Sequence, residues 1–217
     1  LGLIGYLAYK KILDHDINRI ISTIEDQDTK VAAHRVNIPA KITELKEKGI
    51  TNIEIDVFSD NGELVVGHEK ATSSDIPFLE YFEIVNNIIP NFDFIWLDMK
   101  DLTPTNEAEH IKILNALDNK YNIKERVLIE SRYPEAIKIL SQEGWNTGYY
   151  LRYNLSEQPQ EYVQKVLQDL QQKSITAITF PCEHVGYAEK NFTNVSLNCW
   201  TFKRSKYKDE DYNQLKN

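Results

Sequence analysis

Four short motifs hold most of the side chains in this sequence that could carry out a chemical reaction. In chain order they are AHRVN (33–37), IEID (53–56), GHE (67–69) and LDMK (97–100). Together they supply two histidines, an arginine, a lysine and several carboxylates, most of them at or near the ends of apolar, strand-like runs. Such a set could hold one divalent cation beside a phosphate group and move protons on both sides of it.

The carboxylates of two motifs are spaced to share one face of a strand. Glu54 and Asp56 are two residues apart, so both point to the face opposite the apolar residues that alternate with them. Burying two unpaired carboxylates is costly, and a hard cation such as Mg²⁺ or Ca²⁺ would resolve the conflict. In FIWLDMK, Asp98 and Lys100 share a face with Trp96 in the same way and bring a third carboxylate to the pair. The alternatives are a surface antiparallel strand whose acids face water, and an internal salt bridge between Asp98 and Lys100.

Two histidines and an arginine complete the candidate site. His34 and Arg35 end the first predicted strand, and His68 follows a short insert that could return over the same edge of the sheet. Two histidines that flank a phosphate allow one to accept a proton from the attacking oxygen and the other to protonate the leaving oxygen. The guanidinium of Arg35 offers a planar fork for phosphate oxygens. Taken alone, each histidine would be read as a structural residue.

The order of these motifs resembles that of the glycerophosphodiester phosphodiesterase superfamily, whose wider phospholipase-C-like relatives include sphingomyelinase D. His-Arg, Glu-x-Asp, a His after a short insert and an acid-x-Lys strand follow one another as in that family. VLIESRYPEAIKIL resembles the fourth strand and following helix of the family, and CWTFKR resembles its Trp-Thr strand near the end. The resemblance runs from about Val31 to Arg204.

This resemblance implies a phosphoric diester hydrolase, or a phosphodiester-cleaving lyase, that acts on a glycerophosphodiester or a phospholipid head group with one Mg²⁺ or Ca²⁺ ion. It also implies a role for each motif residue. The roles are an acid–base pair of His34 and His68, metal ligands Glu54, Asp56 and Asp98, phosphate-binding cations Arg35 and Lys100, and Trp200 as a wall of the substrate pocket.

Three positions depart from the usual family pattern. Val36 stands where the family usually has Gly after His-Arg, IPAKIT replaces the Pro-Glu-Asn-Thr stretch, and the third acid is Asp98 rather than Glu. HRVN, HEKATSSD and WLDMK are closer to the menorin-type branch, and the Asp of LDMK is also similar to sphingomyelinase D. The departures leave a second hypothesis open, in which a non-catalytic barrel binds a phospholipid head group, a sugar phosphate or a protein partner.

Apolar strand-like runs alternate with amphipathic helical runs, which predicts βαβ units and a parallel sheet. The predicted strands are 30–36, 51–58, 94–100, 126–131, 147–152, 176–180 and 195–202. The predicted helices are 38–48, 77–89, 106–120, 134–143, 158–173 and 184–191, with a charged helical stretch at about 8–26 and a last helix near 208–216. The Asn-Gly pair in SDNGELVVGHE (59–69) predicts a small hairpin after the second strand.

The predicted fold class is α/β, a small (β/α)8 TIM-type barrel. Polar residues at the C-terminal ends of the first four strands favour a barrel over an open doubly wound sheet, and neither G-x-G-x-x-G nor a P-loop occurs. Seven strands are evident, and an eighth is not identified. We expect an N-terminal helical segment over 1–29 and one barrel domain over 30–217.

Composition and net charge limit the class of protein and the class of binding partner. The 41% hydrophobic and 27% charged fractions are typical of a soluble globular domain. A net charge of −8 argues against nucleic acid as a partner, because phosphate backbones are bound by clustered Lys and Arg. The partner that the site favours is a small-molecule or lipid phosphodiester.

Two further features concern the compartment. Cys182 and Cys199 lie near the ends of neighbouring predicted strands, so a bridge is possible, but two free buried thiols are the favoured interpretation. The apolar run over 1–9 is too short to cross a bilayer alone and is either the end of a signal or membrane anchor, or an amphipathic first helix. A Lys-, Asn- and Ile-rich composition indicates a bacterial protein. We expect it to be exported, or anchored to a membrane through its N-terminus, rather than cytoplasmic.

Overall fold

A computed structural model describes residues 31–200 of the chain, and its framework is a seven-stranded sheet. The strands are β1 (Asn52–Asp60), β2 (Glu63–Val66), β3 (Phe94–Met99), β4 (Val127–Ser131), β5 (Asn146–Tyr150), β6 (Ala177–Pro181) and β7 (Ser196–Trp200). Their order in the sheet is β2-β1-β3-β4-β5-β6-β7. Only β2 runs antiparallel to its neighbour, so the predicted parallel sheet is confirmed.

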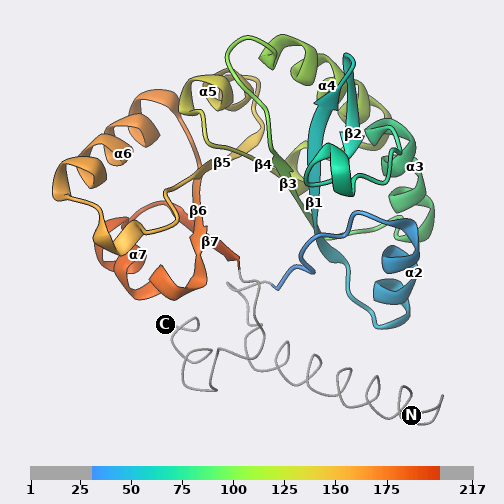
Figure 1. Ribbon diagram of the computed structural model, residues 1–217, viewed down its shortest axis with the longest axis horizontal. Coiled ribbons are helices and arrows are strands. Elements are labelled where there is room, and N and C mark those ends of the chain that lie inside the picture. The colour runs from blue at the N-terminus through green and yellow to red at the C-terminus, as the bar shows by residue number, and fades with distance from the viewer. Residues whose placement is uncertain (1–30, 201–217) are drawn as a thin grey trace. The chain divides into compact units, whose positions relative to one another are not determined.

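A helix precedes β1, helices connect each strand from β2 onward to the next, and the helices lie around the outside of the strands (Figure 1). They are α2 (Pro39–Glu47), α3 (Phe78–Ile88), α4 (Glu107–Tyr121), α5 (Pro134–Gln142), α6 (Gln160–Lys173) and α7 (Val185–Asn191), with short 3₁₀ turns η1 (Lys70–Thr72), η2 (Lys124–Arg126), η3 (Leu155–Glu157) and η4 (Cys182–His184). Prolines open α2 and α5, where a missing N–H costs no helical hydrogen bond. All six helices predicted between 38 and 191 are therefore present.

The two faces of the sheet differ in chemistry because successive side chains point to opposite sides. On β1 the outward-facing Ile53, Ile55 and Val57 are fully buried in the main core under the helices. On the inner face a separate small apolar cluster, centred on Trp96 and Leu128, lies on the same side as the acids of β1. The apolar outer face thus stabilises the fold, while the inner face is available for polar chemistry.

The prediction of a regular strand over 30–36 is wrong. Ala33 makes an isolated parallel bridge to Ile53, with Ala33 N–H donating to Asn52 O at 2.9 Å and Glu54 N–H donating to Ala33 O at 2.8 Å. Arg35 then adopts a left-handed backbone conformation, with φ of 55°, before Val36 N–H returns to Glu54 O at 2.8 Å. The ladder is interrupted because a left-handed residue cannot continue a strand.

The hairpin that was predicted at Asn61-Gly62 is confirmed. Both residues have positive φ angles, 53° and 83°, as a two-residue hairpin turn of type I′ requires. β2 pairs with the C-terminal half of β1, from Val57↔Val66 to Asp60↔Glu63. At the end of β2, Gly67 N–H donates to Asp56 O at 3.0 Å, so the insert does return to the strand that carries the acids.

Within residues 31–200 the sheet is not closed: no strand pairing joins β7 to the 33–36 segment. The predictions for 8–26, 201–202 and 208–216, and the division between 1–29 and 30–217, fall wholly or partly outside the described residues and stay predictions. In the described part of the chain, no helix combines the length and the apolar composition that crossing a bilayer requires.

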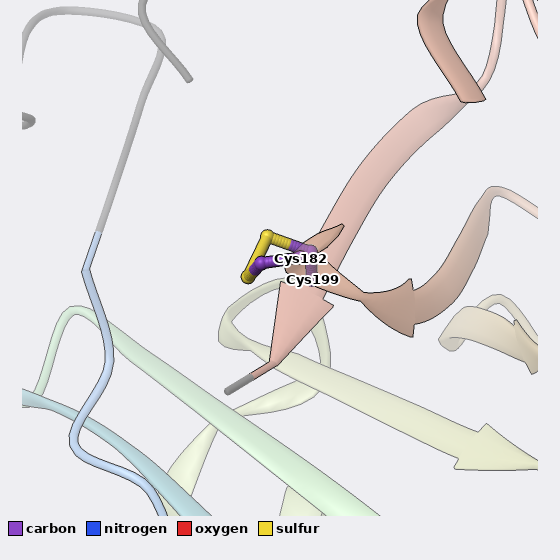
Figure 2. Close-up of a disulfide and its surroundings, with 2 residues drawn as sticks. All are labelled: Cys182 and Cys199. Carbon is purple, nitrogen blue, oxygen red and sulfur yellow. A yellow bond between two sulfur atoms is a disulfide. The ribbon is translucent and has the colours of Figure 1, made fainter. Parts of the chain in front are cut away.

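Cys182 and Cys199 form a disulfide, which corrects the expectation of two free thiols (Figure 2). Strand pairing brings them together, because Cys199 on β7 lies opposite Phe180 on β6 and Cys182 follows directly after that strand. Their Cα atoms are 4.8 Å apart. The sequence places both cysteines near strand ends but does not reveal the register that makes them neighbours.

Candidate active site

Three carboxylates meet on the inner face of β1 and β3. The parallel register sets Asp56 beside Asp98, with Glu54 two residues earlier on β1. One carboxylate oxygen from each of the three lies within 4.8 Å of the others. Glu54 is 5% exposed and Asp56 is fully buried, so the alternative of a surface strand with acids facing water is excluded.

Lys100 and Asn37 hold the acidic cluster in place. The Lys100 ammonium lies 2.6 Å from Asp56 Oδ1 and also donates to Asp98 Oδ2. The side chain of Asn37 pairs reciprocally with Asp56, donating to Oδ2 at 2.7 Å and accepting the Asp56 N–H at 3.0 Å. The salt bridge between Asp98 and Lys100 is therefore present, but it is one part of a larger network and not an isolated pair.

The protonation preferences of the three acids differ. Burial, together with the charge of Asp56, raises the pKa of Glu54 to about 8. Burial also raises the pKa of Asp98. For Asp56 burial acts in the same direction, but the charge and hydrogen bond of Lys100 and the hydrogen bond of Asn37 outweigh it and lower the pKa. Of the three acids, Asp56 is therefore the one whose ionised form the surrounding side chains favour.

A divalent cation fits this donor set. Carboxylate oxygens are the ligands that Mg²⁺ and Ca²⁺ prefer, and three of them converge from two adjacent strands. A bound cation would favour the ionised forms of Glu54 and Asp98, whose pKa values burial raises.

His34 and Arg35 are presented to the acids by the interruption in the first strand. His34 Nε2 lies 3.7 Å from Glu54 Oε2. The backbone N–H of Arg35 donates to the same carboxylate oxygen, and the Arg35 guanidinium reaches Asp56 Oδ2 with its Nε at 3.9 Å. Burial lowers the pKa of His34 to about 4, so its imidazole is neutral at pH 7.

Two side chains from the helices fix this interruption. The Lys41 ammonium of α2 donates to the carbonyls of both His34 and Arg35, the latter at 2.8 Å. The hydroxyl of the fully buried Tyr81 on α3 donates to the Val36 carbonyl at 2.6 Å. Val36, which departs from the glycine of the family pattern, is itself fully buried in the main core. Lys41 was not recognised from the sequence, because its role depends on two backbone carbonyls.

His68 lies on the same side, at the end of the hairpin insert. It is exposed and interacts electrostatically with Lys100, Asp56 and Asp98. The pKa of His68 is lowered, first by partial burial and then by the charge of Lys100. The preceding Gly67 has φ of 156°, and a Cβ there would meet the Cα of Ser73 at 2.7 Å. Only glycine therefore allows the chain to turn so tightly just before His68.

A fourth buried acid was missed by sequence reasoning. Glu130 on β4 lies beside Asp98 and is 1% exposed, and its Oε2 accepts the Trp96 indole N–H at 2.9 Å. Burial, and then the charge of Asp98, raise the pKa of Glu130 well above its ordinary value. The signal was available: Glu130 ends the apolar run VLI of a predicted strand, as Asp98 ends the run FIWL of another.

Trp200, predicted as a wall of the substrate pocket, lies on β7 against the inner apolar cluster. Its ring is stacked on Tyr150 of β5, with centroids 5.9 Å apart and an interplanar angle of 15°. Tyr153 approaches the same indole at 5.9 Å. The inner face therefore carries acids and cations on β1 and β3, and aromatic rings on β5 and β7.

The fold is similar to that of solved glycerophosphodiester phosphodiesterase structures. A glycerophosphodiester phosphodiesterase from Parabacteroides distasonis superimposes with a TM-score of 0.60 at 13% identity, over 82% of each chain. A proposed glycerophosphoryl diester phosphodiesterase from Agrobacterium tumefaciens gives 0.63 at 12% identity, over 87% of this chain and 89% of the other. A proposed glycerophosphodiester phosphodiesterase from Galdieria sulphuraria gives 0.56 at 19% identity, over 86% and 91%.

No protein-family model and no curated protein sequence matches the chain. The structures it resembles are (β/α)8 barrels, so the predicted fold class is confirmed and the described strands make up most of such a barrel. At these identities the likeness is one of fold, and it agrees with the divergent resemblance that the motifs indicate.

Proposed function

We propose that this chain is a metal-dependent phosphodiesterase that cleaves a glycerophosphodiester or a phospholipid head group. The observation that carries the proposal is the convergence of Glu54, Asp56 and Asp98 with two histidines and Arg35 on the inner face of the sheet. A structural cluster of acids would need neither a neutral histidine held against it nor an arginine that interrupts a strand. The shared fold of the phosphodiesterase structures supports the same conclusion.

Each polar residue has a role in this proposal. A Mg²⁺ or Ca²⁺ ion held by the three acids would supply positive charge for a phosphate oxygen. Arg35 binds a second phosphate oxygen through its guanidinium, while Lys100 keeps the acids oriented and contributes positive charge beside them. His34, neutral at pH 7, accepts the proton of the attacking hydroxyl, which belongs to water or to the substrate itself. His68, in the imidazolium form that an anionic phosphate beside it would favour, protonates the departing alcohol, and the proton that His34 has taken up returns to solvent.

The test is cleavage of glyceryl propyl phosphate, followed by ³¹P NMR with Mg²⁺ or Ca²⁺ present, because its alkoxide leaving group must be protonated and its glyceryl arm permits attack by water or by a neighbouring hydroxyl. We expect His34→Ala and His68→Ala each to abolish turnover while the thermal unfolding midpoint stays close to that of the wild type. His184→Ala is the matched control, because His184 Nε2 contacts the Tyr153 carbonyl at 2.7 Å and has no assigned role. Unchanged turnover in both site variants would refute the mechanism. A wild-type chain that binds the cation and inorganic phosphate without cleaving any diester would instead support the non-catalytic barrel.

We also propose that the chain works in an oxidising compartment, exported or anchored at a membrane surface. The disulfide between Cys182 and Cys199 supports this, because such bonds persist outside the reducing cytosol. Maleimide labelling after growth in the producing cell should leave both cysteines unmodified until a reductant is added. Labelling without reductant would contradict the proposal.

A further inference from the structure

The inner face carries a second group of side chains next to the acidic cluster. It consists of Arg132, Tyr150 and Trp200, which we call the aromatic–arginine group. The Arg132 guanidinium lies over the Tyr150 ring, 4.9 Å from its centroid, and Trp200 stacks on the same ring. A cation above an aromatic face is held there by the quadrupole of the ring, so the group is a preformed unit.

This group adjoins the acidic cluster. Tyr150 lies on β5 two residues beyond Gly148, and Gly148 pairs with Glu130, which in turn lies beside Asp98. The electrostatic neighbours of the Tyr150 hydroxyl are Glu130, Arg132, Asp98 and Lys100. A phosphodiester whose phosphate lies at the acids would therefore extend one of its two ester groups toward Tyr150.

A second arginine–tyrosine pair, Arg152 and Tyr162, has the same stacked arrangement as Arg132 and Tyr150 but lies on the helix side of the sheet. Arg152 lies over the ring of Tyr162, 5.0 Å from its centroid, but Tyr162 belongs to α6 and packs against the outer core. The two pairs share the same chemistry, and only the pair of Arg132 and Tyr150 belongs to the inner face. Arg152 is therefore a natural control for the charge and stacking of Arg132.

The positive charge of Arg132 determines which kind of substrate ester group the aromatic–arginine group can accept. The Tyr150 ring, already covered by a guanidinium and an indole, is a poor site for a further cation. Arg132 is exposed and can pair with a carboxylate or a second phosphate through its planar fork. The stacked rings add a flat wall beside that charge.

We infer that the aromatic–arginine group is a specificity subsite for diesters in which one ester group carries an anion, and that Arg132 discriminates against quaternary ammonium groups. This inference rests on the proposed phosphodiesterase function. It names the substrate class, a phosphodiester with a second negative charge, rather than one substrate.

Three synthetic diesters test the inference. All share a glyceryl arm, which permits attack by water or by a neighbouring hydroxyl, and the second arm is 2-carboxyethyl, propyl or 2-(trimethylammonio)ethyl. Cleavage is followed by ³¹P NMR at saturating Mg²⁺ or Ca²⁺. We expect kcat/KM of the wild type to decrease in that order, with a carboxylate-to-ammonium ratio of roughly ten or more. A ratio of this size is expected when the carboxylate forms one partly exposed, charge-assisted hydrogen bond and the ammonium is repelled by the same guanidinium.

The variants separate the subsite from general effects. Arg132→Met should bring the ratio close to one, and Arg132→Glu should invert it, whereas Arg152→Met should leave the ratio at its wild-type value. Thermal unfolding midpoints verify that each variant is folded. An equal ratio in wild type and Arg132→Met, or an equal change in Arg152→Met, would overturn the inference.

Binding of phosphonate analogues of the same three diesters, measured by calorimetry, keeps the two proposals apart. Absence of cleavage in the wild type would overturn the proposed function. The order of the phosphonate affinities, and its dependence on Arg132, would still decide whether the subsite exists.

Discussion

The interaction that most directly links the fold to the proposed chemistry is made by the ammonium group of Lys41. It binds the carbonyls of His34 and Arg35 and so fixes the point where the first strand is interrupted. Both of these hydrogen bonds go to the backbone and not to the acids, so we treat Lys41 as a positioning residue. Replacing it by methionine keeps a side chain of similar length and removes the two hydrogen bonds, together with a positive charge that interacts with Glu54 and Asp56.

The size of the effect follows from these hydrogen bonds. A hydrogen bond to a charged group contributes roughly 1.5–3 kcal/mol when it is shielded from water. Lys41 is partly buried, and both bonds share one ammonium, so their combined loss should cost about 2 kcal/mol. If this cost falls on the local conformation that presents His34, the equilibrium constant for that conformation decreases about 30-fold. The kcat value should fall by up to that factor, with a much smaller change in KM.

Steady-state kinetics on bis(p-nitrophenyl) phosphate measure this effect. Lys41→Arg should recover part of the lost kcat because it retains the charge, and Lys46→Met, at an exposed position of the same helix, should behave as wild type. The reasoning is refuted if Lys41→Met keeps kcat within two-fold of wild type, or if Lys46→Met loses as much.

Three further predictions concern stability. In the metal-free chain, Glu54 has a folded-state pKa of about 8 against an ordinary 4.5, so it stays protonated when the unfolded chain has already ionised. The stabilisation of the folded state by Glu54 is complete below pH 4.5 and is lost as the pH rises toward 8. His34 has the opposite effect: because its pKa is lowered to about 4, its contribution makes the folded state more stable as the pH rises from 4 to 6.5. Urea unfolding in EDTA should therefore give up to about 2 kcal/mol less stability at pH 8 than at pH 6.5 from Glu54, and Glu54→Gln should reduce the difference, with Asp98 and Glu130, whose pKa values are also raised, accounting for the remainder. Gly67→Ala should destabilise the chain by about 1–3 kcal/mol because the added Cβ meets the Ser73 backbone; a variant with wild-type stability and turnover would disprove this. Reducing the Cys182–Cys199 bond, which closes a sequence separation of 17, should lower the free energy of unfolding by about 3 kcal/mol, and an unchanged urea midpoint would argue against it.

Strand periodicity made the faces of the sheet predictable. Glu54 and Asp56 could be assigned to one face of their strand, and Asp98 and Lys100 to one face of theirs, because side chains alternate along a strand, whatever the tertiary structure. The helices were equally accessible, since prolines mark two of their starts and amphipathic patterns mark their extents. These features depend on short stretches of sequence only.

Features that depend on register or on backbone conformation could not be predicted in the same way. The disulfide requires Cys199 to lie beside the end of β6, and strand pairing between distant segments sets that register. The interruption at Arg35 requires Lys41 and Tyr81 to supply hydrogen bonds from two helices. Glu130 also ends an apolar strand-like run, and its register beside Asp98 shows that it belongs with the other acids.

Calorimetric titration of the metal-free chain with Mg²⁺ and Ca²⁺ tests the central claim most directly. The three converging carboxylates should bind one ion per chain. Asp98→Asn, at the most exposed of the three acids, should abolish binding without unfolding the chain. Absence of binding to the wild type, or equal binding to Asp98→Asn, would contradict the account.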